Sequence, residues 1–240
     1  MSEKNLEPKT TKSIRIVTSV LTKALKLWLR SQVSRVDELD VQIKATDRQL
    51  LSGSIPWVSI SANNAIYQGL HLTSIQLTAE SIRIDIGSVL RGKPLQLLEP
   101  IPVTGKVLLL ESDLNASLTS DLLSTALKDA LVKLIPEHRP NSKLITWEKI
   151  ILGNNQLMLS AIPDTESQNI PVTPDTICIG LKLLSGHELQ LILIETQHST
   201  QEFLESEPKH YLDLGNDVDI QELTVVPGKL TCHGRINVNP

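Results

Sequence analysis

Hydrophobic and polar side chains alternate along much of the segment 55–87. The alternation is clearest in Val58-Ser59-Ile60-Ser61-Ala62 and recurs in shorter form at 70–72, 75–77 and 82–86. A period of two places every second side chain on one face of a sheet. Turn signals at Asn63-Asn64 and Gln68-Gly69 divide the strands. The pattern predicts a sheet with a smooth aliphatic face, which suits contact with either protein or fatty chains.

Residues 13–36 have a helical period instead. On a helical wheel the apolar side chains between Ile14 and Arg30 cover an arc of roughly 220°. An arc that wide requires burial on more than one side. A second amphipathic helix is predicted at 121–135, because Ser120 is a suitable N-cap and Pro136 ends the pattern.

The remaining chain reads mainly as strands. Strands are expected at 39–45 and 103–110, and three C-terminal hairpins at 144–162, 176–195 and 218–238, the last turning at Pro227-Gly228. The segment 48–53 is expected to lead to a break at Pro56, and long polar loops are expected at 163–174 and 198–209. The sum is an α+β fold, with two long helices against a large antiparallel sheet.

Composition and charge narrow the function classes. The 240 residues are 40% apolar and 21% charged, which is typical of a globular protein, but only 2% are aromatic. A net charge of −4 argues against a nucleic-acid binder. Residues 1–36 hold eight basic and two acidic side chains, a balance of +6, so the remainder carries −10. A basic N-terminal segment followed by an acidic remainder favours an anionic surface as the partner of that segment.

Targeting and cysteine signals are few. Basic residues recur between Lys12 and Arg35, so the uninterrupted apolar stretch of a signal peptide is missing. No segment approaches the ~20 apolar residues that span a bilayer. We therefore expect a cytoplasmic protein, either free or peripheral at the cytoplasmic face of a membrane. Cys178 and Cys232 are expected to be buried free thiols in strands, without a disulfide or zinc site.

Catalytic signatures are not found in the sequence. It has no GxSxG, P-loop, GxGxxG or HExxH motif, and its six histidines lack metal-ligand spacing. Glu111 and Asp113 are of the type used in acid/base chemistry, but a capping or surface role is favoured. We predict a protein that is not an enzyme and has no cofactor or metal, apart from a possible bound phospholipid.

Four segments resemble the bacterial LmeA-like phospholipid-binding family. They are Asp47–Gly53, Ala65–Leu72, Leu90–Leu95 and Glu111–Leu118. The resemblance extends over residues 22–238 and is densest from Asp47 to Leu134. It implies a tubular lipid-binding-like fold, in which a long helix is cradled by a curved antiparallel sheet, and it implies phospholipid binding. The expected organisation is a disordered basic segment over 1–12 and a single lipid-binding-like domain over 13–240.

Three roles fit the N-terminal helix. It can be an ordinary core helix with a solvated basic face, it can lie on an anionic membrane, or it can line a lipid cavity in the trough of the sheet. Its basic residues are predicted to face headgroups or the membrane: Arg15, Lys23, Lys26 and Arg30.

The favoured hypothesis is a non-enzymatic phospholipid-binding protein, active in lipid transfer or sensing, that holds acyl chains between the N-terminal helix and the aliphatic sheet face. Such pockets are mostly apolar. The predicted lipid contacts are Val17, Leu21, Leu25, Trp28, Leu29, Val58, Ile60, Leu70, Leu72, Ile75, Leu77, Ile82, Ile84, Leu123 and Leu127. The alternative is a membrane-surface scaffold or adaptor with a fully packed core, anchored by the basic helix. The sequence identifies no protein partner.

Overall fold

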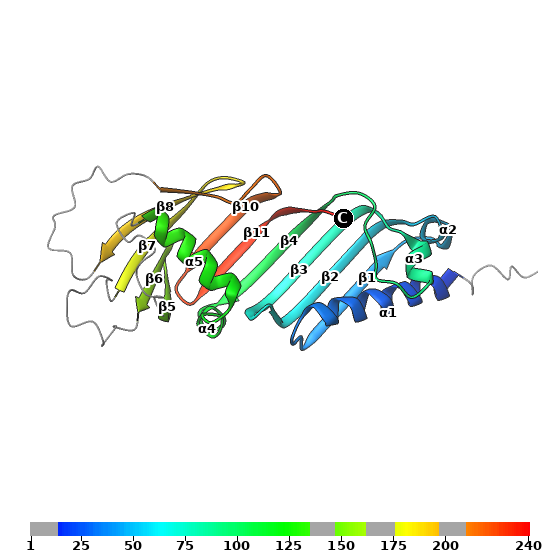
Figure 1. Cartoon of the computed structure of the whole chain (residues 1–240), viewed down its shortest axis with the longest axis horizontal. Helices are drawn as coiled ribbons and strands as arrows, with labels where there is room; N and C mark the ends of the chain where they lie inside the picture. The colour runs from blue at the N-terminus through cyan, green and yellow to red at the C-terminus, as the bar shows by residue number, and fades with distance from the viewer. Residues whose placement is uncertain (1–13, 135–146, 162–175, 197–209) are drawn as a thin grey trace, which may run out of the picture.

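The strands form two antiparallel sheets in the computed structural model, which describes residues 14–134, 147–161, 176–196 and 210–240 (Figure 1). The strands are β1 (Glu38–Lys44), β2 (Ser54–Tyr67), β3 (Leu70–Arg83), β4 (Ile101–Leu110), β5 (Trp147–Gly153), β6 (Gln156–Ala161), β7 (Thr176–Ser185), β8 (Glu188–Thr196), β9 (His210–Asp213), β10 (Val218–Val226) and β11 (Lys229–Val238). The larger sheet has the order β1-β2-β3-β4-β11-β10 and the smaller one β5-β6-β7-β8-β9. The α+β class is confirmed, with two sheets in place of one.

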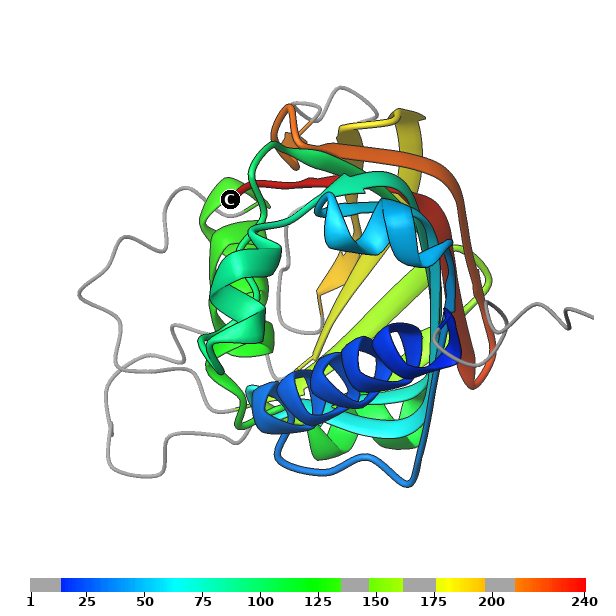
Figure 2. The same ribbon diagram turned by 90° about the vertical axis from the view of Figure 1, so that its right-hand side faces the viewer.

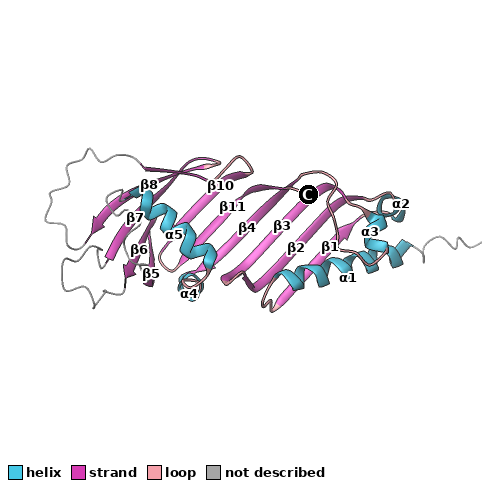
Figure 3. Ribbon diagram, in the orientation of Figure 1, coloured by secondary structure: helices cyan, strands magenta, loops and turns pink. Residues whose placement is uncertain are grey.

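Helices lie over the two ends of this strand array. They are α1 (Ile14–Gln32), α2 (Asp47–Leu51), α3 (Ile86–Leu90), α4 (Glu111–Ala116) and α5 (Asp121–Leu134). A view along the long axis shows α1 inside the curve of the strands (Figure 2). Between α4 and α5 at one end and α1 and α3 at the other, strands alone are seen (Figure 3). The middle of the larger sheet therefore has no helix across it among the described residues.

The hydrophobic core is divided in the same way. The first cluster joins Leu21 and Leu25 of α1 to side chains of β1, β2, β3 and β4, among them Val41 and Val58. The second cluster joins Leu127 and Leu131 of α5 to the smaller sheet, including the fully buried Ile150. Each end of the molecule is thus stabilised by its own apolar packing.

The β5–β6 turn connects the two sheets. The Asn155 N–H donates to the Val225 carbonyl of β10 at 2.9 Å, and the Asn155 carbonyl accepts from the Leu181 N–H of β7 at 2.9 Å. One residue of the smaller sheet's first hairpin therefore bridges the edge strand of the larger sheet and a central strand of its own.

Several local expectations are wrong. Residues 47–51 are helical because the sequence holds a complete capping box, in which the Thr46 hydroxyl accepts from the Gln49 N–H and the Gln49 side chain accepts from the Thr46 N–H. Pro56 lies inside β2 and causes no break. Asn64 also lies inside β2, where a positive φ of 49° takes the place of the predicted turn.

Other boundaries are confirmed or moved. The first helix ends at Gln32. The Ser120 hydroxyl accepts the Leu123 N–H at 3.2 Å, as an N-cap should. The alternation at 82–86 is cut short, because β3 ends at Arg83 and Asp85 caps α3. The predicted segment 1–12 and the two long polar loops lie outside the described residues. In the described part of the chain, no helix has the length and hydropathy that crossing a membrane requires.

Candidate functional site

The two faces of the larger sheet differ sharply in polarity. On the face toward the helices, one row across the strands reads Ala62, Ile75, Val107, Cys232 and Leu223. The row on the opposite face, one residue away on each strand, reads Ser61, Gln76, Lys106, His233 and Glu222. The face predicted from the alternation at 58–62 and 75–77 is therefore real and extends over β4 and β11. We call the apolar side the inner face.

Part of the inner face belongs to neither core cluster. Five neighbouring residues of this part form what we call the central strip: Ile75, Gly105, Val107, Cys232 and Gly234. All five residues are half-buried. Ile75 pairs with Val107 and Val107 pairs with Cys232, while Gly105 pairs with Gly234 in the next row. The strip is a band of apolar surface whose packing by protein is incomplete.

The two glycines of the strip both lie close to neighbouring atoms. A Cβ on Gly234 would lie 2.5 Å from the Asp219 carbonyl oxygen of β10. A Cβ on Gly105 would lie 3.0 Å from Cδ2 of Leu77, so Leu77 leans over this glycine.

Burial raises the pKa of the Cys232 thiol above its usual range. Neither cysteine forms a disulfide; Cys232 is only half-buried, whereas Cys178 is buried as predicted.

Most of the predicted lipid contacts lie within protein packing. Buried in the first cluster are Leu21, Leu25, Val58, Ile82 and Ile84, and half-buried against it are Leu29, Ile60 and Leu77. Leu127 is buried in the second cluster and Leu123 packs against it. Since Leu21 and Leu25 share a cluster with Val41 and Val58, α1 packs against the sheet through these side chains.

The other predicted contacts lie elsewhere. Ile75 lies in the central strip. Leu72 lines a pocket described below, and Leu70 begins β3 at the hairpin turn. Trp28 is 39% exposed on α1. The side chain of Val17 lies outside the described residues.

The wide apolar arc of α1 is only partly used by the fold. Leu21 and Leu25 are buried, whereas Val20 is 54% and Leu27 is 69% exposed. On a helical wheel Val20, Ala24, Leu27 and Trp28 form one continuous sector. We call this sector the exposed apolar face of α1.

Basic side chains border this face unequally. Lys23 and Arg30 are exposed and lie next to Leu27 on the wheel. Lys26 makes an ion pair with Asp40 of β1 at 3.5 Å. The side chain of Arg15 lies outside the described residues.

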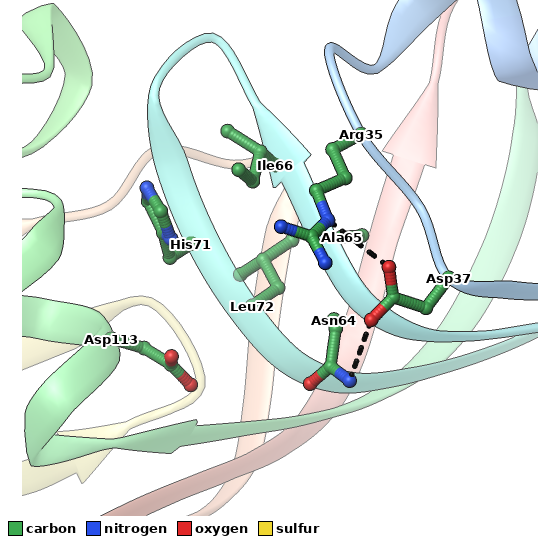
Figure 4. A pocket seen from close by; sticks show the side chains of 8 residues that line it. All are labelled: Arg35, Asp37, Asn64, Ala65, Ile66, His71, Leu72 and Asp113. Carbon is green, nitrogen blue, oxygen red and sulfur yellow. Dashed lines mark hydrogen bonds and ion pairs between the residues drawn. The ribbon is translucent and has the colours of Figure 1, made fainter.

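A polar pocket opens where the β2–β3 hairpin passes between the segment after α1 and α4. Its volume is about 260 Å³ (Figure 4). On one side the Ser34 N–H donates to the Ile66 carbonyl at 2.8 Å, and on the other the His71 N–H donates to Ser117 Oγ at 2.7 Å. The pocket is lined by Arg35, Asp37, Asn64, Ala65, Ile66, His71, Leu72 and Asp113.

Three polar side chains of this pocket are linked by hydrogen bonds. Arg35 Nε donates to Asp37 Oδ1 at 3.0 Å, and Asn64 Nδ2 donates to Asp37 Oδ2 at 3.1 Å (Figure 4). The hydrogen bond from Arg35, followed by that from Asn64, holds the pKa of Asp37 below its ordinary value. Sequence inspection missed this group, because its members come from segments far apart in the chain.

The carboxylate pair considered for catalysis has structural partners. Glu111 Oε2 accepts the Leu152 N–H of β5 at 2.9 Å. Asp113 accepts the Thr73 hydroxyl, and Thr73 Oγ1 accepts the Leu110 N–H at 3.0 Å. Among the described residues, no group of three or more His, Cys, Asp or Glu side chains is arranged to hold a metal ion.

Comparison with known protein families gave a match over most of the chain. The sequence profile of the LmeA-like phospholipid-binding family matches residues 13–235, which is nearly the whole chain. Searches of curated proteins and of solved structures gave no significant match. The matched range spans both sheets, the central strip and the polar pocket. The chain therefore belongs to the LmeA-like phospholipid-binding family.

Proposed function

We propose that the protein binds a phospholipid without catalysis and holds its acyl chains against the central strip. The observation that carries this proposal is the incomplete packing of Ile75, Val107 and Cys232 on an otherwise apolar inner face. The family membership supports the same ligand class. Whether the lipid is transferred or sensed depends on how it is released.

The strip is chemically suited to hydrocarbon. It contains aliphatic side chains, a protonated thiol and two glycines, so no charged group competes with an acyl chain for the surface. Burying hydrocarbon contributes about 0.8 kcal/mol per CH₂. A chain with ten buried CH₂ groups would therefore gain about 8 kcal/mol before the entropy cost of ordering. Binding of this kind needs few specific contacts.

This proposal places the chains differently from the prediction made from sequence. The prediction put them between the N-terminal helix and the sheet. Leu21 and Leu25 are buried there against protein, whereas Ile75 and Val107 lie outside both clusters. The proposed contacts therefore shift along the inner face, away from α1 and toward β4 and β11.

A matched pair of substitutions on β4 tests the proposal. Val107→Asp places a carboxylate on the strip, while Lys106→Asp makes the same change on the opposite, exposed face. Phospholipid that co-purifies, or that is taken up from vesicles, is extracted and quantified by mass spectrometry. We expect Val107→Asp to lower lipid occupancy about tenfold or more, because an unpaired charge opposes hydrocarbon, and Lys106→Asp to leave it unchanged.

Circular dichroism shows whether Val107→Asp is folded, and the neutral Val107→Asn replaces it if it is not. Lipid occupancy that is equal in the wild type and in a folded strip variant contradicts the proposal. So does a wild-type protein that neither carries phospholipid nor takes it up from vesicles.

The exposed apolar face of α1 favours a second candidate function, attachment to an anionic membrane surface. Leu27, Val20 and Trp28 are exposed on one side of the helix, with Lys23 and Arg30 at the border. A helix with this division lies in the plane of a membrane with its apolar side down. In this alternative, α1 anchors a surface scaffold or adaptor and the interior binds no lipid.

Vesicle flotation combined with lipid extraction separates the two candidates. Binding to anionic vesicles by a protein that carries no extractable lipid favours the scaffold function. Extractable lipid in a protein recovered free of vesicles favours the lipid-binding function.

A further inference from the structure

The polar pocket and the central strip share one strand. His71 lines the pocket and Ile75 lies in the strip, four residues further along β3. At about 3.4 Å per residue, their backbones are about 14 Å apart. Arg35, in the segment after α1, lines one side of the pocket, and Asp113 of α4 lines the other.

Resting on the proposed function, we infer that this pocket binds the headgroup of the same phospholipid: Arg35 and His71 contact the phosphate, and Asp113 receives a hydrogen-bond donor of the head alcohol. The ligand class is a zwitterionic phosphodiester of the phosphoethanolamine type. The lipid thus runs along β3, from the hairpin to the strip.

Arg35 is presented to the pocket as a phosphate ligand. Its Nε donates to Asp37 Oδ1, and its side chain is 67% exposed, so the rest of the guanidinium group is accessible to a ligand. Within the described part of the chain, its two terminal amino groups have no hydrogen-bond partner, and Figure 4 shows them on the pocket side. A guanidinium group binds phosphate through two parallel hydrogen bonds. His71 approaches from the other side of the pocket and can add one ring N–H (Figure 4).

The carboxylates of the pocket select the charge of the headgroup. Asp37 balances Arg35, and Asp113 adds a further negative charge opposite them. One Asp113 oxygen accepts the Thr73 hydroxyl, which leaves the other to accept an ammonium or hydroxyl donor. A doubly charged phosphate monoester would face this surplus negative charge, whereas an ammonium-bearing diester places its positive end beside it.

The size of the pocket limits what it holds. Its volume of about 260 Å³ falls below the ~300–1,000 Å³ of sites that enclose a whole drug-sized ligand. Three of its eight lining residues are apolar: Ala65, Ile66 and Leu72. The pocket can therefore take a small headgroup, while the hydrocarbon must leave it.

The test compares two lipids with identical acyl chains and different heads. Dioleoyl phosphatidylethanolamine and dioleoylglycerol are titrated into wild type, Arg35→Gln and Arg235→Gln, where Arg235 is an exposed arginine on the outward face of β11. We expect Arg35→Gln to weaken phosphatidylethanolamine binding about tenfold or more, because charge-assisted hydrogen bonds are lost. Dioleoylglycerol binding should change less than twofold, and Arg235→Gln should change neither.

Two further arms complete the test. Arg35→Lys keeps the positive charge but lacks the paired N–H donors of the guanidinium group, so it should lose part of the affinity for phosphatidylethanolamine. His71→Gln should weaken the binding of phosphatidylethanolamine and leave that of dioleoylglycerol unchanged. Equal weakening of both lipids by Arg35→Gln, or of neither, overturns the inference while leaving the proposed function intact. Free O-phosphoethanolamine that binds as tightly as the lipid also overturns it, because the pocket would then serve a soluble phosphate ester. Wild-type protein that binds neither lipid overturns the proposed function itself.

Discussion

The side chain of Asn115 on α4 makes two hydrogen bonds with the backbone of Ile150 on β5. Asn115 Nδ2 donates to the Ile150 carbonyl at 2.8 Å, and Asn115 Oδ1 accepts the Ile150 N–H at 2.8 Å. Glu111, one helical turn earlier, accepts the N–H of Leu152. β5 is an edge strand of the smaller sheet. Two side chains of α4 thus satisfy backbone groups that a further strand would otherwise pair.

Replacing Asn115 by Ala should destabilise the protein. Ile150 is fully buried, so its N–H and carbonyl would lose their partners without gaining water. Each buried backbone group left unpaired costs about 1–3 kcal/mol, and we expect the free energy of unfolding to fall by about 2–4 kcal/mol. Urea denaturation followed by circular dichroism measures the change. Asn154→Ala, in the exposed β5–β6 turn, is the matched control and should change stability by less than about 0.5 kcal/mol.

Replacing Leu27 by Ser should weaken binding to anionic vesicles without weakening the fold. Leu27 is 69% exposed, so its removal from α1 costs little packing. If the side chain inserts into a bilayer, its transfer is worth about 1.5–3 kcal/mol, and vesicle affinity should fall about 10-fold or more. Vesicle co-sedimentation measures affinity and thermal denaturation measures stability. An unchanged affinity would show that α1 does not enter the bilayer.

Two lysines of α1 should differ in their effect on vesicle binding. Lys23 is exposed, whereas Lys26 is paired with Asp40 at 3.5 Å. A basic residue near an anionic membrane contributes about 1 kcal/mol, so Lys23→Gln should weaken binding about fivefold at low salt. Lys26→Gln should weaken it less, because the Asp40 charge already offsets Lys26. Equal losses in the two variants would show only a general attraction between charges.

Asp85 should make the stability of the protein depend on pH. Its carboxylate accepts the Ser88 hydroxyl at 2.6 Å and the Ser88 N–H at 3.1 Å, and these hydrogen bonds lower the pKa of Asp85. A pKa that is lower in the folded state stabilises the protein above the unfolded value of about 3.9, and this contribution is lost as pH falls through the folded value. Asp85→Asn keeps the capping oxygen and removes the charge.

The thermal midpoint of Asp85→Asn should therefore lie below that of the wild type at pH 7. The two midpoints should converge at an acidic pH below the folded pKa of Asp85. A difference of the same size at both pH values would show that the charge of Asp85 has no part in capping α3.

Elements with strong local signals could be predicted from the sequence. The Pro227-Gly228 turn, the Ser120 cap and the alternation in β1 are each encoded by neighbouring residues, and the structure confirms all three. The α2 helix was missed although Thr46 and Gln49 carry a complete capping signal. A turn was predicted at Asn63-Asn64 and a break at Pro56, and both predictions are wrong. Pairing with β3 keeps β2 continuous through these positions.

Features that depend on tertiary contacts could not be predicted. The division into two sheets depends on contacts such as Asn155 with Val225, which leave no periodic trace in the sequence. The arc of α1 shows which residues are apolar, but only the fold decides that Leu25 is buried and Leu27 is exposed. The polar pocket was missed for the same reason, since Arg35, Asn64, His71 and Asp113 approach one another only after folding.

The most direct measurement of the central claim is the alkylation rate of Cys232. In a Cys178→Ala variant, Cys232 is the only thiol, and it lies in the strip where acyl chains are proposed to bind. Its raised pKa makes a mildly alkaline buffer suitable for a maleimide reagent.

As a control, Lys106→Cys in a protein without native cysteines places the thiol on the outward face. Bound phospholipid is quantified by extraction in every sample. We predict that phospholipid slows alkylation of Cys232 about tenfold or more and leaves that of the outward thiol unchanged. Equal rates for Cys232 with and without bound lipid would contradict the account.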